Sequence, residues 1–198
     1  MKARIAVFVS GGGSNLQALI DQSGKTLKSG VITLVVADRP CSARERARNA
    51  GIPFAEIQRG PDFEEKALAI LQERKIDLVI LAGFLSILSA EFVSVYKDRI
   101  INIHPSLIPA FAGPGYYGLR VHRAALKRGV QITGATVHIV NEIPDGGPII
   151  LQKAVAVRKH DTPETLQLRV LKEAEWVILP KAAEMVSKAI VKGEPTWK

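Results

Sequence analysis

Three side chains of complementary chemistry stand where apolar, strand-like runs end. Asn102 and His104 follow one such run, and Asp145 opens an Asp-Gly-Gly-Pro turn between two later runs. An amide, an imidazole and a carboxylate together can polarise a carbonyl, stabilise an oxyanion and move one proton. Because Asn102 and His104 are two residues apart at a strand end, both side chains can point to the same side. We therefore expect Asn102, His104 and Asp145 to form a catalytic group; an ordinary turn role for Asp145 is the alternative.

A glycine-rich turn, Ser10-Gly11-Gly12-Gly13-Ser14-Asn15, follows the first apolar run. Glycine allows tight turns and lets backbone N–H groups approach a ligand, and a helix N-terminus adds partial positive charge. The motif is not a P-loop, because no Gly-Lys-Ser/Thr follows, and Leu16 stands where a dinucleotide fingerprint has its third glycine. We expect a phosphate or carboxylate to bind at Gly11, Gly12, Gly13 and Ser14; a plain tight turn is the alternative.

Other candidate centres are weak or excluded. Cys41 is the only cysteine, which excludes an internal disulfide and a cysteine-based zinc site. His122, His138 and His160 lack partners at metal-ligand spacing, and we expect them to be structural or exposed. The apolar residues that follow Gly83 line either a flat ligand slot or the core, and the pattern leaves both open. No Gly-x-Ser-x-Gly elbow is present, so serine hydrolase chemistry is not expected.

Strands and helices alternate along the first half of the chain. The strands expected there span residues 5–9, 31–37, 53–57, 77–82 and 99–103. Besides a helix over 14–22, capping-box spacing predicts helices that begin at Ser42 and Asp62, and Ser89 is expected to cap another.

The second half begins with an expected helix over 119–128 and two long strands over 132–140 and 149–157. Thr162-Pro163 is typical of a helix start, and Pro180 interrupts or kinks the helix that follows. The apolar stripe of this helix comprises Leu166, Val170, Ala174 and Val177.

This order of elements predicts an α/β fold: a Rossmann-like open sheet, mostly parallel, with helices on both faces and mixed C-terminal strands. A single domain over residues 1–198 fits the length. Ligands of such sheets lie beyond the carboxyl ends of the strands, where residues 11–14, 83–88 and 102–106 all fall. We therefore expect these segments to share one cleft.

The composition is that of an ordinary globular enzyme, with 47% hydrophobic and 23% charged residues. A dispersed net charge of +8 favours anionic small substrates. No basic stripe with interleaved aromatic residues is present, so nucleic-acid binding is not expected. The first apolar run is too short for a signal peptide or a bilayer span, so we expect a cytoplasmic protein without a membrane partner. The oligomeric state stays open, with a homodimer as one alternative.

Together the motifs resemble those of a known family. Residues 10–17, 81–84, 102–107, 134–138 and 145–150 are similar to the motifs of folate-dependent glycinamide ribonucleotide formyltransferases. The resemblance covers nearly the whole chain. It implies transfer of the formyl group of 10-formyltetrahydrofolate to the glycyl amine of 5'-phosphoribosylglycinamide, in de novo purine (IMP) synthesis. It also implies a ribonucleotide-binding half, 1–103, and a folate-binding and catalytic half, 104–198.

The resemblance implies roles for individual residues. Gly11, Gly12, Gly13 and Ser14 would hold the substrate phosphate, and Glu175 would bind the glycinamide end. Protonated His104 and the amide of Asn102 would donate hydrogen bonds to the developing oxyanion, while Asp145 would favour the charged imidazole. The folate-binding residues would be Arg59, Leu85, Ser86, Ile87, Leu88, Asn102, Asn141, Glu142, Ile143, Pro144 and Asp145. The folate enters as a co-substrate, and no metal is implied.

The chain departs from the pattern of this family at three places. Ser86 stands where many members carry an arginine, and Gly60 stands where another arginine is usual, with Arg59 beside it as a substitute. Residues 112–118 form a longer stretch than usual, which would suit a mobile flap or a contact surface.

Three other functions are alternatives to the formyltransferase that the resemblance implies. Formyltetrahydrofolate hydrolase would use the same catalytic residues, but its relatives carry a histidine where this chain has Pro105 and an extra regulatory domain. A methionyl-tRNA formyltransferase would need a further RNA-binding domain, for which 198 residues leave no room. A nucleotide-binding regulatory module would use Asp38, after the second strand, to contact a ribose hydroxyl.

Overall fold

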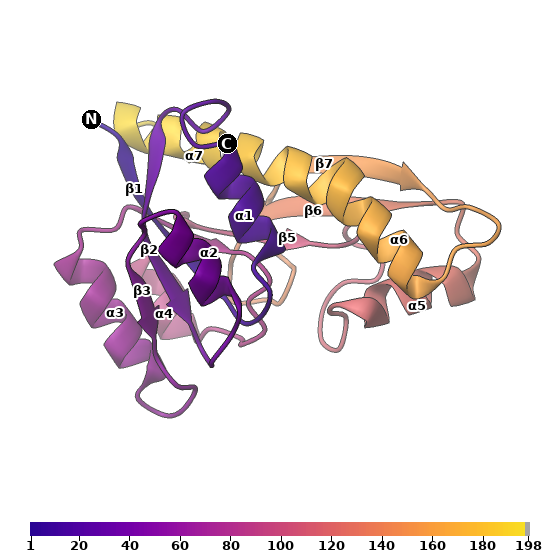
Figure 1. The fold of residues 1–198 in the computed structure, drawn as a ribbon, viewed down its shortest axis with the longest axis horizontal. Helices are drawn as coiled ribbons and strands as arrows, with labels where there is room; N and C mark the ends of the chain where they lie inside the picture. Colours follow the sequence, from indigo (N-terminus) through magenta and orange to yellow (C-terminus); the bar gives the residue numbers. More distant parts are fainter. Residues whose placement is uncertain (197–198) are drawn as a thin grey trace.

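A computed structural model describes residues 1–196, whose apolar runs form one seven-stranded sheet (Figure 1). The strands are β1 (Ala3–Val9), β2 (Gly30–Ala37), β3 (Phe54–Glu56), β4 (Leu78–Leu81), β5 (Ile100–His104), β6 (Ile132–Ile139) and β7 (Ile149–Ala156). Their order is β3-β2-β1-β4-β5-β6-β7. Strands β1 to β5 pair in parallel, whereas β5-β6 and β6-β7 pair antiparallel. The expected Rossmann-like sheet with mixed C-terminal strands is therefore confirmed.

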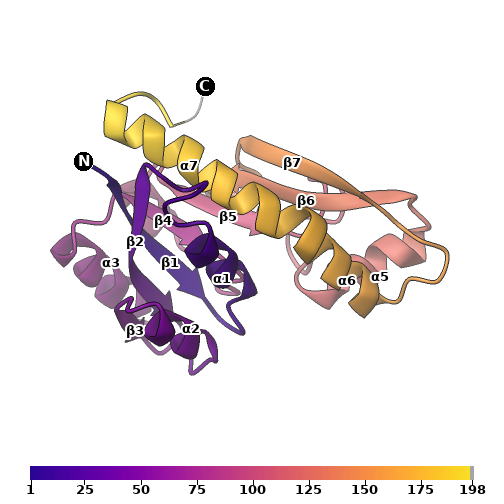
Figure 2. The same cartoon turned by 45° about the horizontal axis from the view of Figure 1, so that its top comes forward.

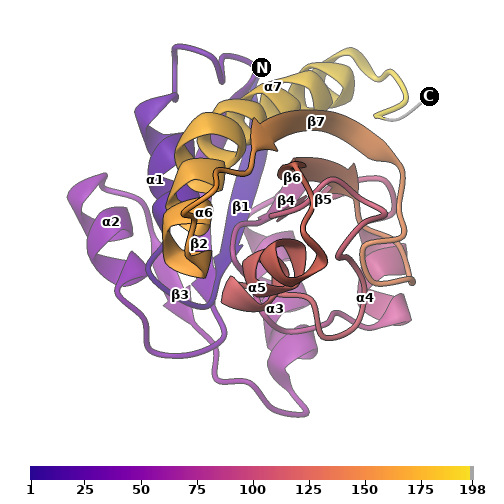
Figure 3. The same cartoon turned by 90° about the vertical axis from the view of Figure 1, so that its right-hand side faces the viewer.

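Helices cover both faces of this sheet. They are α1 (Ser14–Asp21), α2 (Ala43–Asn49), α3 (Phe63–Glu73), α4 (Ala90–Val95), α5 (Leu119–Arg128), α6 (Pro163–Val170), the π-helical turn η1 (Leu171–Glu175) and α7 (Trp176–Lys192). The last three form one long helix that crosses a face of the sheet (Figure 2). Helices α5 and α6 lie side by side at the β7 end (Figure 3).

The alternation of side chains along β1 divides the core between the two faces. Ile5, Val7 and Val9 pack with α1, α2 and α7, while Ala6 and Phe8 pack with α3 and α4. All five side chains are fully buried. Successive strand residues point to opposite faces, so a continuous apolar run is what a strand covered on both sides requires.

Two of the expected helix caps differ in detail. Ser89 and Thr162 accept hydrogen bonds from the backbone N–H groups of Phe92 and Thr165, as expected. Helices also begin directly after Ser42 and Asp62, but neither of these side chains accepts a capping hydrogen bond. The expected starts of these two helices are therefore confirmed, whereas the capping-box contacts expected at Ser42 and Asp62 are wrong.

The π-helical turn η1 changes which residues of the last helix are buried. Leu166, Val170 and Ala174 are buried as expected, but the next buried apolar residue is Ile178, and Val177 lies partly exposed. A π-turn holds one residue more than an α-turn, so the buried stripe shifts by one position. The helix continues through Pro180 rather than ending there.

Gly134 in β6 is a position where the fold excludes any side chain. A Cβ there would lie 2.1 Å from the backbone oxygen of Lys153 and 2.8 Å from Cδ2 of Leu107. We expect Gly134→Ala to lower the free energy of unfolding by about 3 kcal/mol, because the β6–β7 pairing must shift. Gly60→Ala is the matched control, since its Cβ would meet nothing within 4 Å. Urea denaturation of both variants tests this, and equal stabilities would contradict it.

Candidate active site

The cleft of the protein lies where the order of the strands reverses. From β1 the chain leads to β2 on one side, and from β4 to β5 on the other, so the loops after β1 and β4 meet at this switch point. Ser10 N–H donates to the Gly83 oxygen at 3.1 Å, and Leu85 N–H donates to Ser10 Oγ at 2.9 Å. The cleft, of about 720 Å³, is lined by residues from the start of α1, from the loop after β4 and from β5, β6 and η1.

Asn102, His104 and Asp145 do converge in this cleft. Asp145 Oδ2 lies 3.4 Å from His104 Nδ1, and its Oδ1 lies 3.6 Å from His138 Nε2. Asn102 stands directly opposite His138 in the β5–β6 pairing, and its Nδ2 lies 3.1 Å from His138 Nε2. Together with His138, the three side chains therefore form one contiguous polar group from two strands and one turn.

His138 also belongs to this group, whereas its sequence context predicted only a structural or exposed histidine. Its Nδ1 lies 2.8 Å from the Ile139 oxygen, and a carbonyl only accepts, so Nδ1 carries the hydrogen. Nε2 then accepts from the amide of Asn102, which fixes the direction of that amide. The place of His138 in the site depends on the antiparallel register of β5 and β6, which the spacing of residues in the sequence does not reveal.

Close packing of two glycines brings Asp145 to the histidines. A Cβ at Gly147 would lie 1.8 Å from the Ile139 oxygen, and one at Gly146 would lie 2.6 Å from Ile143 Cγ2. The turn therefore packs directly against the end of β6. Asp145 itself has a positive φ of 57°, a conformation that Asp tolerates better than most residues.

Burial and charge oppose each other at the imidazole of His104. Burial lowers the pKa of His104 below its usual value, and the Asp145 carboxylate and the Phe111 carbonyl offset this only in part. Burial alone would raise the pKa of Asp145, but the neighbouring imidazoles of His138 and His104 and the Gly113 N–H hold it below its usual value. Burial in the free protein thus disfavours the charged imidazole, and the Asp145 carboxylate is the group that favours the protonated His104 expected above.

The stretch 112–118 and the residue before it cover this polar group. The Phe111 oxygen accepts from His104 Nε2 at 2.8 Å, and Gly113 N–H donates to Asp145 Oδ2 at 2.8 Å. Tyr116 and Tyr117 also line the cleft. The longer stretch thus contributes to the wall of the site through its backbone.

The expected folate-binding residues all line the same cleft. They are Arg59, Leu85, Ser86, Ile87, Leu88, Asn102, Asn141, Glu142, Ile143, Pro144 and Asp145. Ile87 is 73% exposed and Ile143 is 65% exposed, so these apolar side chains are not core. Of the apolar residues after Gly83, Leu85 and Ile87 are exposed at the cleft, which is typical of a binding slot, whereas Phe84 and Leu88 pack against the core.

Asp38 is fully engaged within the protein. It is 1% exposed, accepts from Ser86 Oγ at 2.7 Å and pairs with Arg39 at 2.9 Å. A carboxylate so occupied has no accessible oxygen for a ribose hydroxyl, which argues against the nucleotide-binding module.

The glycine turn lies beside the cleft rather than in its wall. Gly11 and Gly12 are exposed and Gly13 is buried, but none of them lines the cleft. Ser14, the first residue of α1, lines the cleft and also a second cavity of about 380 Å³. The glycine turn, at which an anion is expected to bind, thus leads into α1, whose first residues, Ser14 and Asn15, line the cleft.

Glu175, at the end of η1, is a buried carboxyl group in the cleft wall. Asn15 Nδ2 donates to its Oε2 at 2.7 Å, and Asn15 Oδ1 is buried without a hydrogen-bond partner. Burial raises the pKa of Glu175 to about 7, and the hydrogen bond from Asn15 opposes the rise only in part. Asn15 was not among the site residues expected from the sequence.

We expect Glu175→Gln to stabilise the protein at high pH. The pKa of Glu175 rises from its usual 4.5 to about 7 on folding, so between these pH values the folded state binds more protons and stability falls as pH rises. A neutral Gln removes this cost, on the order of 3 kcal/mol above pH 7, and its amide can donate to Asn15 Oδ1. Unfolding measured at pH 4 and pH 8 tests this: a gain equal at both values would contradict it.

Two features are absent from residues 1–196, the part of the chain that the structure describes. No group of three or more His, Cys, Asp or Glu side chains is arranged to hold a metal ion. Across the same residues, no helix combines the length and the apolar character needed to cross a membrane.

A Rossmann-like sheet whose switch point carries an amide, an imidazole and a carboxylate beside an apolar slot is suited to enzymes that stabilise a developing oxyanion and move a proton. Residues 3–182 match the sequence model described as formyl transferase, and the chain belongs to this family.

Individual relatives agree with this family. The human trifunctional purine biosynthetic protein adenosine-3 is 43% identical over 196 residues, which are 96% of this chain and 19% of that protein. The chain thus spans about a fifth of that relative. The Bacillus subtilis phosphoribosylglycinamide formyltransferase is 37% identical over 87% of this chain and 90% of its own length. The crystal structure of the Anaplasma phagocytophilum phosphoribosylglycinamide formyltransferase has a TM-score of 0.86 and 39% identity, and covers 95% of this chain and 88% of that one.

Proposed function

We propose that this chain transfers the formyl group of 10-formyltetrahydrofolate to the glycyl amine of 5'-phosphoribosylglycinamide, in de novo purine (IMP) synthesis. The observation that carries the proposal is the convergence of Asn102, His104 and Asp145 beside an apolar slot and the N-terminus of α1. The relatives named above support the choice of acceptor. The folate is a second substrate, and the mechanism uses no metal.

The slot fits a flat ring system with a polar edge. Leu85, Ile87 and Ile143 supply exposed apolar surface at its mouth. Asn141 and Glu142, on the loop before Asp145, supply polar groups at its wall. Pockets of this kind hold an aromatic ring by its faces and select it through a few hydrogen bonds at its edge.

Asn102 and His104 would act as the oxyanion donors. His138 uses one hydrogen of the Asn102 amide, and the second remains for the formyl oxygen. The N–H of His104 Nε2, held by the Phe111 oxygen in the free protein, would turn to the same oxygen when substrate displaces the loop. Donors fixed in advance toward developing charge are the largest single contribution to many such reactions.

His104 and Asp145 would also move one proton. As negative charge develops on the formyl oxygen, it favours the charged imidazole, so Nδ1 can take up the proton that the attacking amine loses. Asp145 Oδ2, 3.4 Å from Nδ1, stabilises that charge. The same proton then passes to the departing folate nitrogen, which breaks the bond to the formyl carbon, and no covalent enzyme intermediate is needed.

An absorbance assay with 10-formyltetrahydrofolate, run with and without 5'-phosphoribosylglycinamide, tests the proposal. We expect loss of the formyl group only when the acceptor is present. Formate release without the acceptor would instead identify a formyltetrahydrofolate hydrolase. Binding of NAD(H) without folate binding, measured by calorimetry, would support the nucleotide-binding module.

A further inference from the structure

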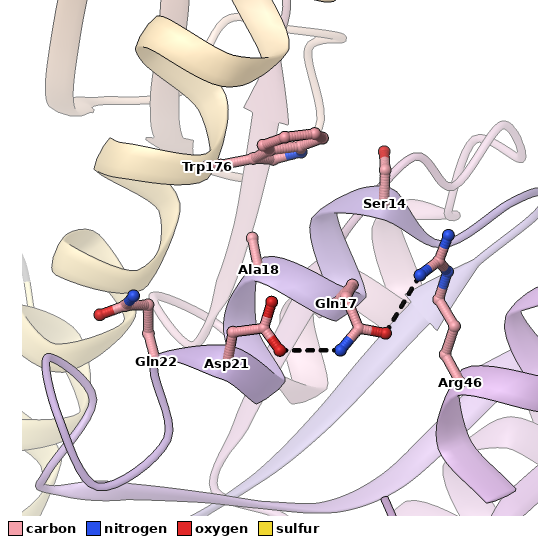
Figure 4. A pocket seen from close by; sticks show the side chains of 7 residues that line it. All are labelled: Ser14, Gln17, Ala18, Asp21, Gln22, Arg46 and Trp176. Atoms are coloured by element: carbon pink, nitrogen blue, oxygen red, sulfur yellow. Dashed lines mark hydrogen bonds between the residues drawn. The ribbon is translucent and has the colours of Figure 1, made fainter. Parts of the chain in front are cut away.

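Arg46, on α2, lies against the glycine turn with no carboxylate beside it. Its Nε donates to the Gly12 oxygen at 2.7 Å, and its Nη1 donates to Gln17 Oε1 at 3.1 Å. Figure 4 shows its guanidinium reaching from α2 toward Gln17, next to Ser14. Within residues 1–196, Arg46 forms no ion pair, so its hydrogen bonds place it without neutralising it.

The other two arginines of this helix behave differently. Arg44 pairs with Glu56 at 2.6 Å, and Arg48 pairs with Glu45 at 3.2 Å. Both are held by carboxylates on the protein surface. Arg46 is therefore the arginine of α2 whose charge is left for another anion.

Helix α2 also fixes the backbone of the glycine turn. Ala43 N–H donates to the Gly11 oxygen at 3.2 Å, and Arg46 holds the Gly12 oxygen. In a planar trans peptide the N–H points opposite to the C=O. The N–H groups of Gly12 and Gly13 therefore point away from α2, and within residues 1–196 neither donates to a backbone acceptor in the turn.

The turn has no room to relax toward α2. A Cβ at Gly13, where φ is +68°, would lie 2.8 Å from Ala43 Cβ and 3.3 Å from Arg46 Cδ. Arg46 also lines the cavity of about 380 Å³, together with Ser14 and Gln17 (Figure 4). The turn is thus packed against α2, and Arg46 contacts both the turn and the cavity.

We propose that Arg46 is a positioning residue for a phosphate monoester bound at the glycine turn. It holds the Gly12 carbonyl so that the Gly12 and Gly13 N–H groups face the phosphate, and its charge adds to the positive potential there. The identity of the ligand, the phosphate of the ribonucleotide acceptor, rests on the proposed function. Contact between Arg46 and the phosphate itself is not required.

The test compares Arg46→Met with Arg48→Met, which removes the same charge from the same helix. We expect Arg46→Met to weaken binding of inorganic phosphate, and to raise the KM of the acceptor, by roughly tenfold to hundredfold, the loss typical of a hydrogen bond to a charged group. The kcat and the Kd of folate are expected to stay near the parent values. Arg48→Met is expected to leave all four quantities near the parent values.

Arg46→Lys keeps the charge and recovers part of phosphate binding, because an ammonium can reach the Gly12 oxygen without the fixed fork of arginine. It also provides the test if Arg46→Met unfolds. Equal phosphate affinities of Arg46→Met and Arg48→Met would overturn the proposal, as would a loss of folate binding as large as the loss of phosphate binding. If the parent protein binds phosphate but transfers no formyl group, the proposed function fails while the effect of Arg46 on phosphate is still measured.

Discussion

Replacing His104 with alanine is expected to lower kcat on the order of a hundredfold to a thousandfold, the usual cost of removing an oxyanion donor. His104 is 4% exposed, and its Nε2 is one of the two donors proposed for the formyl oxygen. The apolar slot and the glycine turn do not include this side chain. Binding of folate and of the acceptor is therefore expected to stay close to that of the parent protein.

His160→Ala serves as the control for His104→Ala, because His160 is an exposed histidine outside the cleft. Steady-state rates give kcat and KM, and calorimetry gives the affinity for folate. Thermal unfolding shows whether the folded state survives the loss of a buried ring. A folded His104→Ala variant with a kcat near that of the parent would contradict the role proposed for the imidazole.

Asp145→Asn is expected to lower kcat on the order of a hundredfold or more, as loss of a group that supports proton transfer does. The carboxylate raises the pKa of His104 against the effect of burial, so its removal lowers that pKa further and disfavours the imidazolium. The new amide oxygen can still accept from Gly113 N–H, which keeps the stretch 112–118 in place. The change therefore acts on charge more than on structure.

The pH profile distinguishes this effect from a structural one. Since the charged imidazole becomes harder to form, we expect the kcat profile of Asp145→Asn to shift toward lower pH at the limb that reports His104. Asp62→Asn, at an exposed ion pair with Lys66 outside the cleft, is the control. An unshifted profile with unchanged kcat would refute the proton-transfer role of Asp145.

The fold was largely predictable from the sequence because its strands are buried on both faces. Continuous apolar runs such as that of β4 predict buried parallel strands without knowledge of any contact. The π-turn was not predictable, since nothing in the local spacing of Leu166, Val170 and Ala174 distinguishes it from an α-helix. It became visible only through the burial of Ile178 in place of Val177.

Site residues that follow the ends of strands were predictable from the sequence, whereas the site residue whose position depends on strand pairing was not. Asn102, His104 and Asp145 carry recognisable groups at such positions, and the structure brings them together. His138 lies within a strand, and only the β5–β6 register places it opposite Asn102. The charge state of His104 depends on how deeply it is buried, which the sequence does not encode locally.

The π-turn η1 takes up one residue more than a regular helix would hold between Val170 and Ile178. Deleting one residue from it would leave an ordinary α-turn, and the helix on either side would keep its buried face. Ile178 and Leu179 would then stay in the core, and the side chains of η1, Glu175 among them, would be the ones to move. A relative with one residue fewer in this segment can therefore keep the long helix and would differ from this chain in the wall of the cleft.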